Sequence, residues 1–208
     1  DYCWQAGQLL FENYQCVLIV TGFYVTRLSA PETDGPPGAL AIGRALTALG
    51  GRAVYVSDQY TAPLLRAHAG ADCEVVCFPI RDETQSRVTA QALLRQYQPS
   101  LVLSTERCGV TDGGVYRNCL GQDISAYTAR LDSLFHSEIP SLGIGDGGNE
   151  IGMGKLARVI PTLPGLPREP AITATTALVI ASVSNWGAYG VVAALSALAG
   201  RDLLPEPE

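Results

Sequence analysis

Short apolar runs rich in β-branched residues recur along the chain, separated by longer stretches in which apolar positions have helical spacing. Each run is a few residues long and apolar on both faces, which is typical of strands in a parallel sheet covered by helices on both sides. Strands are predicted at residues 16–21, 53–57, 74–78, 100–105 and 141–144. Helices are predicted at residues 38–49, 62–69, 84–96, 125–135 and 186–198.

This alternation predicts an α/β fold, a three-layer doubly wound (Rossmann-like) domain with a mostly parallel sheet. We expect residues 1–208 to form one domain, since a chain of this length can bury most of the surface that it exposes when unfolded. A proline-rich stretch at 161–170 predicts a surface connection before apolar character resumes at 172–182. In such sheets ligands bind at the carboxyl ends of the strands, so the loops that follow the strands are expected to carry the function.

Composition narrows the class of protein. Hydrophobic residues make up 47% of the chain and charged residues 16%, which indicates a globular protein with a large core. The net charge of −6, with Lys and Arg scattered, argues against nucleic acid as a partner. No apolar run reaches the roughly 18 residues that a membrane span needs. We therefore expect a small-molecule partner, no nucleic acid, no membrane, and a possible homo-oligomer.

The six cysteines show no paired C-x-x-C spacing, and most lie in apolar or strand-like stretches. We interpret them as reduced thiols in a reducing compartment, because a chain with a good core has little need of disulfides. The first residues do not show the basic segment followed by an apolar segment that is typical of a leader peptide. The expected location is cytoplasmic, or the mitochondrial matrix in a eukaryote.

The glycine-rich segment 143–148 follows a predicted strand and formally fits the dinucleotide pattern G-x-G-x-x-G. A pyrophosphate there would meet the carboxylates of Asp146 and Glu150, and like charges at short range repel. No NAD or flavin is therefore expected. The oxygens of Asp146, Asn149 and Glu150 instead suit a hard divalent cation, Mg²⁺ or Mn²⁺. The alternative is a tight turn in which Asp and Asn only bond their own backbone.

Two further loops at strand ends carry acids. Glu32 and Asp34 precede Gly-Pro-Pro-Gly at 35–38 and a predicted helix, so one of them could simply cap that helix. The two acids beside a rigid Pro-Pro pair indicate more than a cap. Glu106 and Arg107 end the fourth predicted strand and could be a plain ion pair. At this edge of the sheet binding is favoured, with Arg107 offering bidentate geometry to a substrate carboxylate.

Other segments carry weaker signals. Residues 111–118 form a polar, glycine-bearing loop that either closes over a ligand or is an ordinary surface loop. His68 and His136 have no acidic or hydroxyl residue at a motif spacing, so neither is expected to be catalytic. The chain lacks the Gly-x-Ser-x-Gly and His-Glu-x-x-His motifs, which argues against hydrolase triads and zinc peptidase chemistry.

Taken together, several strings resemble the C-terminal domain of D-glutamate cyclases, and the resemblance covers nearly the whole chain. The two longest, Glu-Thr-Asp-Gly-Pro-Pro-Gly at 32–38 and Gly-Asp-Gly-Gly-Asn-Glu-Ile-Gly-Met-Gly at 145–154, are the most specific. Shorter matches are Thr-Gly-Phe at 21–23, Glu-Arg at 106–107 and Ser-Asn-Trp-Gly at 184–187. The resemblance implies a lyase that takes an amino-acid-like substrate and dehydrates D-glutamate to 5-oxo-D-proline.

Lactam closure assigns hypothetical roles to these residues. A cation at the predicted metal site would polarise the γ-carboxyl, Arg107 would hold the α-carboxylate, and Glu106 or Asp34 would move protons. The predicted catalytic residues are Glu32, Asp34, Glu106, Arg107, Asp146 and Glu150. The predicted substrate-binding residues are Thr21, Gly22, Thr33, Gly35, Arg107, Asp112, Asn118, Gly147, Gly148, Asn149 and Asn185. The predicted metal ligands are Asp146, Asn149, Glu150, Glu32 and Asp34.

Two other functions remain open at this point. Clustered acids at strand ends serve a metal-dependent hydrolase or phosphatase equally well, which activity on phosphate esters would reveal. A non-catalytic module that binds a small molecule through the same loops predicts thermal stabilisation by the ligand without turnover.

Overall fold

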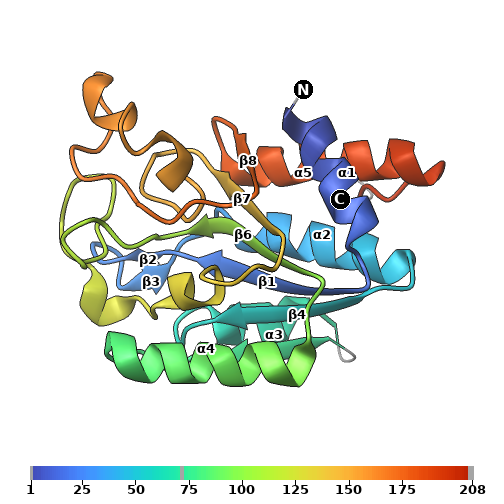
Figure 1. Cartoon of the computed structure of the whole chain (residues 1–208), viewed down its shortest axis with the longest axis horizontal. Coiled ribbons are helices and arrows are strands. Elements are labelled where there is room, and N and C mark those ends of the chain that lie inside the picture. Colours follow the sequence, from blue (N-terminus) through green and yellow to red (C-terminus); the bar gives the residue numbers. More distant parts are fainter. Residues whose placement is uncertain (1, 71–72, 206–208) are drawn as a thin grey trace.

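The structure, a computed structural model, describes residues 2–70 and 73–205. Its centre is a six-stranded sheet in the order β5-β4-β1-β6-β7-β8, and every neighbouring pair is parallel (Figure 1). The strands are β1 (Cys16–Gly22), β4 (Arg52–Ser57), β5 (Glu74–Cys77), β6 (Leu101–Arg107), β7 (Ser141–Gly145) and β8 (Ala177–Ile180). The order runs outward in both directions from the β1–β6 pair, which confirms the predicted doubly wound, Rossmann-like architecture.

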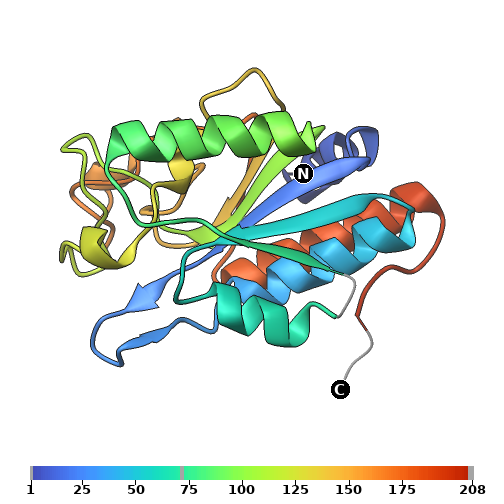
Figure 2. The same cartoon turned by 90° about the horizontal axis from the view of Figure 1, so that it is seen from below.

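Helices cover both faces of this sheet (Figure 2). Helix α4 (Glu83–Tyr97) lies on one face, and the other face carries α2 (Pro36–Ala48), α3 (Ala62–His68) and α5 (Ser184–Ala199). Strand β1 shows why both faces are apolar. Its residues Val17 and Ile19 belong to the core under α2 and α5, whereas Leu18 and Val20 belong to the core under α4.

The predicted helix at 125–135 is wrong. The segment forms two short 3₁₀ helices, η1 (Ser125–Tyr127) and η2 (Leu131–Leu134), with extended backbone at Thr128 between them. Side chains take the carbonyls that a continuous helix would use: the Thr128 hydroxyl donates to the carbonyl of Ile124 at 3.0 Å, and Arg107 donates to that of Ala129 at 2.9 Å. The backbone therefore gains its hydrogen bonds outside a helix.

Several elements have no counterpart among the predictions. Helix α1 (Tyr2–Glu12) packs on α5 so closely that a Cβ on Gly7 would lie 2.8 Å from the Cβ of Ala194. A small antiparallel hairpin, β2 (Tyr24–Val25) with β3 (Ala30–Pro31), projects after β1. The connection before β8 contains the 3₁₀ helices η3 (Gly154–Leu156) and η4 (Ile160–Thr162).

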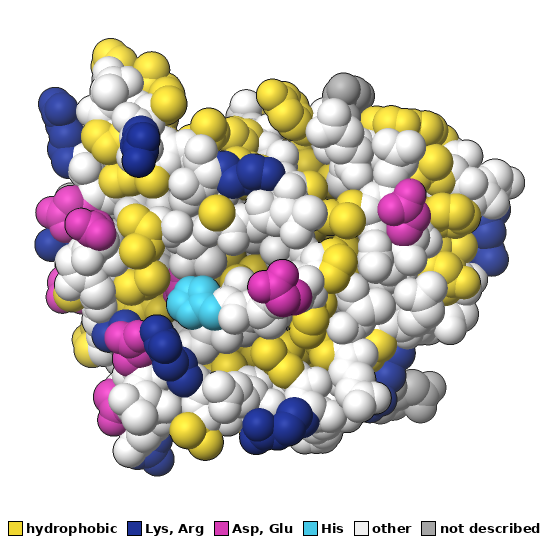
Figure 3. All heavy atoms as spheres, in the orientation of Figure 1, with side chains coloured by type: hydrophobic (Ala, Val, Ile, Leu, Met, Phe, Trp, Pro, Cys, Tyr) yellow, Lys and Arg dark blue, Asp and Glu magenta, His cyan; other side chains and the backbone are white. Residues whose placement is uncertain are grey.

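The surface carries charges of both signs. On the face drawn in Figure 3, Lys and Arg side chains stand in small separate groups among Asp and Glu. Within residues 2–70 and 73–205, no helix is both long and apolar enough to cross a bilayer. Free thiols are present at Cys16, Cys73, Cys77, Cys108 and Cys119.

Candidate functional site

Three carboxylates converge at the point where the strand order reverses. Asp34 lies just before α2, Glu106 near the end of β6, and Asp146 just after β7; one oxygen of each lies within 4.8 Å of the other two. Glu106 is buried, and the other two are half-buried. We call these three side chains the acidic cluster. Three negative charges this close repel one another unless protons or a cation offset them.

Glu106 owes its position to a bulge in the sheet. Thr21 pairs with Thr105 but Gly22 pairs with Arg107, so Glu106 is the extra residue on β6. Its φ of 44° is in the left-handed region, which a non-glycine residue adopts only when its surroundings hold it there. Gly35 leaves the necessary room, because a Cβ at Gly35 would lie 2.7 Å from the Cβ of Glu106.

Asp34 and Asn185 tie two helix N-termini together at the cluster. The Asp34 carboxylate accepts the N–H groups of Ser184 at 2.9 Å and Asn185 at 2.8 Å, at the start of α5. In return, the Asn185 side-chain oxygen accepts the N–H groups of Gly35 at 3.0 Å and Gly38 at 2.8 Å, at the start of α2. Asp34 thus caps α5 and Asn185 caps α2, and the positive ends of both helix dipoles point toward the cluster.

Glu150 lies beneath the cluster, held by the glycine-rich loop. Its carboxylate accepts the N–H groups of Gly147 and Gly148, both at 2.8 Å, and the residue is buried. A Cβ at Gly145 would lie 2.9 Å from a Glu150 oxygen. The absence of a side chain at Gly145 therefore lets the Glu150 side chain fold back against the end of β7. Burial raises the pKa of Glu150 to about 7, the nearby Asp146 adds to the rise, and the two N–H bonds oppose it.

Burial and mutual repulsion raise other pKa values in the site. Burial raises the pKa of Glu106 well above its usual range, and Glu150 and Asp146 raise it further. The Ser184 hydroxyl, which donates a hydrogen bond to Glu106, favours its ionised form. Burial and Asp34 raise the pKa of Asp146, and burial, Asp34 and Asp146 raise that of Glu32. The site therefore attracts protons or a cation more strongly than isolated carboxylates would.

The predicted metal ligands are only partly brought together. Asp34 and Asp146 meet, and Glu106, expected as a proton carrier, joins them as the third carboxylate. Glu32 and Glu150 lie outside this group of three, although Glu32 is close enough to raise the pKa of Glu106. Asn149 donates its side-chain N–H to the carbonyl of Arg117 at 3.0 Å, so its amide ties the loop to a neighbouring segment.

The role expected for Arg107 does not fit the structure. Its guanidinium is buried in an ion pair with Asp58 at 2.6 Å, the exposed fractions of the two side chains being 1% and 3%. It also donates to the carbonyls of Gly22 and Ala129, both at 2.9 Å. Because both terminal nitrogens are already bonded inside the protein, Arg107 holds β1 and β6 in place and does not offer a fork to a substrate carboxylate.

Two other predicted binding residues also lie away from the cluster. Asp112 lines a separate cavity on the α4 side of the sheet. Asn118 bonds its own loop, its side-chain oxygen accepting the N–H groups of Leu120 at 3.1 Å and Gln122 at 2.9 Å. The ordinary surface-loop interpretation of 111–118 therefore holds for Asn118.

The remaining predicted residues lie around the cluster in supporting positions. Thr21 is fully buried at the end of β1, and its hydroxyl has no hydrogen-bond partner among the described residues. Thr33 is exposed on the rim, and its carbonyl accepts an N–H of Asn185 at 3.4 Å. Asp58 was assigned no role from the sequence, although its place just after β4 at the binding edge was a usable signal. Ser184 was named only within the Ser-Asn-Trp-Gly match.

Comparison with known sequences adds a family to this geometry. A family model described as D-glutamate cyclase-like, C-terminal, matches residues 1–208. The human mitochondrial D-glutamate cyclase is 33% identical over 172 residues, which cover 74% of this chain and 28% of the human protein. The match thus spans less than a third of that relative's length.

Among solved structures, the ligand-free aldohexose dehydrogenase of Thermoplasma acidophilum aligns with 64% of this chain and 49% of its own, at 14% identity and a TM-score of 0.33. A likeness this weak supports no functional argument. The Rossmann-like assignment rests on the strand order and the helix layers described above.

Proposed function

The chain belongs to the D-glutamate cyclase-like family, and from that premise we propose that it is a lyase that dehydrates D-glutamate to 5-oxo-D-proline. The observation that supports the proposal most is the acidic cluster. Among the described residues, none of its three carboxylates forms a salt bridge. A partly buried cluster of carboxylates without a cationic side chain, at the ligand-binding edge of this fold, is typical of an active site.

The chemistry requires that protons move but not that any be supplied. The amine nitrogen bonds to the γ-carboxyl carbon while one C–O bond breaks, and the oxygen leaves as water. The ammonium loses two protons on its way to the lactam, and the departing oxygen needs two protons. Carboxyl groups whose pKa values are raised can accept the first and donate it again, which is what general acid–base catalysis demands.

Within this scheme, the residues divide by depth. Glu106 lies deepest in the cluster, and its raised pKa fits it to carry protons between nitrogen and oxygen. Asp34 and Asp146 are half-buried and border the open side, where they meet the substrate ammonium or a cation. Glu150 acts through Asp146, because it is buried beneath the cluster and bonded to the glycine-rich loop.

A divalent cation, Mg²⁺ or Mn²⁺, is part of the proposal. The donor set fits it: three hard carboxylate oxygens within 4.8 Å of one another, on a group open to solvent at one side. When bound, such an ion polarises a carboxyl group and offsets the repulsion within the cluster. Asp34, Glu106 and Asp146 would hold it, and no role is assigned to NAD or flavin.

The deciding experiment incubates the metal-stripped protein with D-glutamate or L-glutamate, with and without Mg²⁺ or Mn²⁺, and follows 5-oxoproline by chiral chromatography. The proposal predicts a D-selective product that depends on the added ion. A D-selective product without added ion would support the lyase reaction but contradict the role of the cation. The substrate ammonium would then be the positive charge in the cluster. Thermal stabilisation by glutamate without product would instead favour a binding module.

The place of the reaction is part of the same proposal. The human relative is named as a mitochondrial protein, and the free thiols fit a reducing compartment. We propose the cytoplasm, or the mitochondrial matrix in a eukaryote.

A further inference from the structure

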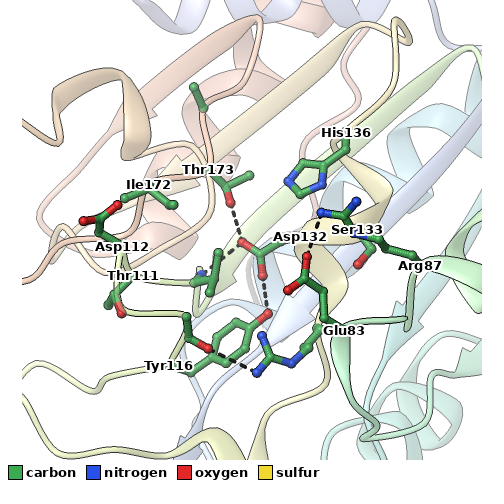
Figure 4. A pocket seen from close by; sticks show the side chains of 14 residues that line it. Glu83, Arg87, Thr111, Asp112, Tyr116, Asp132, Ser133, His136, Ile172 and Thr173 are labelled. Atoms are coloured by element: carbon green, nitrogen blue, oxygen red, sulfur yellow. Dashed lines mark hydrogen bonds and ion pairs between the residues drawn. The ribbon is translucent and has the colours of Figure 1, made fainter. Parts of the chain in front are cut away.

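A second cavity lies on the α4 side of the sheet, apart from the acidic cluster (Figure 4). Its volume of about 370 Å³ suits a small molecule. None of Asp34, Glu106 or Asp146 lines it. Its wall combines basic, acidic and hydroxyl side chains, the basic ones being Arg87, Arg130 and His136.

Arg130 is held in place by a cation–π contact and one hydrogen bond to a carbonyl. Its guanidinium lies over the Tyr116 ring, 5.4 Å from the centroid, and one terminal nitrogen donates to the carbonyl of Gly114 at 3.1 Å. Within the part of the chain that the structure describes, Arg130 forms no salt bridge. Stacking on one face and one bond at the edge fix the plane of the fork and leave donors for a ligand.

Arg87 adds a second guanidinium that a ligand can recruit. It pairs with Glu83 one turn earlier on α4 at 2.6 Å, and both side chains are more than half exposed. An exposed pair of this kind contributes little stability, so a ligand carboxylate can replace Glu83 at small cost. Figure 4 shows His136 beside Arg87, with Asp112 on the opposite side of the cavity.

The floor of the cavity is rigid and its one buried charge is satisfied. Asp132 is buried and accepts hydrogen bonds from the Val110 N–H at 3.0 Å, the Tyr116 hydroxyl at 2.6 Å and the Thr173 hydroxyl at 2.5 Å. Val110 and Tyr116 pair with each other within one loop, and Thr173 lies in the connection before β8. The network therefore fixes Tyr116, and through it the platform on which Arg130 stacks.

We propose that this cavity binds a small carboxylic acid of amino-acid size, whose carboxylate is held by Arg130 and Arg87. Guanidinium forks match the planar geometry of a carboxylate, and the hydroxyl-lined floor provides further polar contacts. Asp112, which lies on the opposite side of the cavity from Arg87, would meet an amino group at the other end of such a ligand.

Backbone hydrogen bonds connect the cavity wall to the segment that carries Glu150. Val110 in the cavity wall follows Gly109, whose N–H donates to the carbonyl of Asn149 at 2.8 Å, and Ile151 donates to Arg107 at 2.8 Å. Glu150 lies between those two bonded residues. A ligand in the cavity would therefore lie close to the segment that carries Glu150, while remaining outside the cluster itself.

The test is calorimetric titration of the protein with glutarate, a dicarboxylate without an amine, in the presence of EDTA so that no metal draws it into the acidic cluster. Binding is expected, and Arg130→Gln should weaken it about tenfold or more, the effect of losing charged hydrogen bonds. Arg117→Gln is the matched control, because Arg117 pairs with Glu169 at 2.8 Å and does not line the cavity. Glu106→Gln should leave binding intact.

Glu83→Gln gives a readout that misfolding cannot imitate, since releasing Arg87 should tighten glutarate binding. The inference is overturned if no heat is measured, if Arg117→Gln weakens binding as much as Arg130→Gln, or if Glu106→Gln alone abolishes it. Because the assay needs no turnover, its result is independent of the proposed lyase reaction.

Discussion

Glu106 and Arg107 are neighbours in the sequence and both are buried at the end of β6, yet their surroundings are opposite. Arg107 meets an aspartate and two carbonyls, so its charge is compensated. Glu106 meets other carboxylates, and a serine hydroxyl partly offsets their repulsion by favouring its charge. A compensated buried charge holds the fold together, whereas an uncompensated one costs stability and is kept where chemistry needs it.

The largest effect on activity is expected from Glu106→Gln, which keeps the shape of the side chain and removes its charge and proton. Turnover of D-glutamate should fall by about 10²- to 10⁴-fold, the usual contribution of a general acid–base group. The free energy of unfolding should not decrease, because repulsion within the cluster is relieved. Steady-state kinetics and urea unfolding measure the two effects. Glu12→Gln, the same change at an exposed position, is the control, and equal turnover in both variants would refute the assigned role.

Arg107→Met should act on stability instead. It leaves Asp58 buried without its partner, which is expected to lower the free energy of unfolding by about 3–5 kcal/mol. The double variant with Asp58→Asn should lose less than the sum of the two single changes, because the charges are coupled. Strictly additive losses in denaturant titrations would show that the pair is not coupled.

Stability should depend on pH in the direction set by the raised pKa values. Burial moves the pKa of Glu150 from its ordinary 4.5 to about 7, so between these values the folded protein binds more protons than the unfolded chain. The contribution of Glu150 to the free energy of unfolding of metal-stripped protein should therefore fall as pH rises from 4.5 to about 7.

A cation competes with the same protons, so Mn²⁺ should raise the Tm more at pH 8 than at pH 5. When the free Mn²⁺ concentration is a hundred times its Kd, the free energy of unfolding at pH 8 should rise by about 2.7 kcal/mol. Differential scanning calorimetry at both pH values tests this. An equal rise in Tm at both pH values would show that the ion binds outside the acidic cluster.

The smallest effect is expected from Ser184→Ala. The Ser184 hydroxyl donates to Glu106 and lowers its pKa, so removing it should move the Glu106 limb of the pH–rate profile toward higher pH. The folded protein should lose only about 1 kcal/mol, the value of one hydrogen bond. Ser196→Ala, a hydroxyl on the far turns of the same helix, serves as the control. An unchanged pH–rate profile would show that Ser184 does not affect the titration of Glu106.

Some of the site could be predicted because it depends on local order along the chain. A loop that follows a parallel strand lies at the binding edge whatever its contacts, so Asp34, Glu106 and Asp146 could be nominated from position alone. The partners of each side chain could not be predicted. Arg107 finds Asp58 across 49 residues, and Asp34 finds Ser184 across 150.

The apolar pattern by itself determined five of the six strands of the main sheet, most of the helices and the parallel, doubly wound architecture, because the spacing of apolar residues shows which faces are buried. Tertiary structure alone decided that 125–135 is not a continuous helix, since Arg107, a distant side chain, takes a carbonyl within it. It also decided the acidic cluster, through the bulge at Glu106 and the register between β1 and β6. The physical reason is that periodicity records how much of a residue is buried, whereas the charge that it meets depends on which distant segment packs against it.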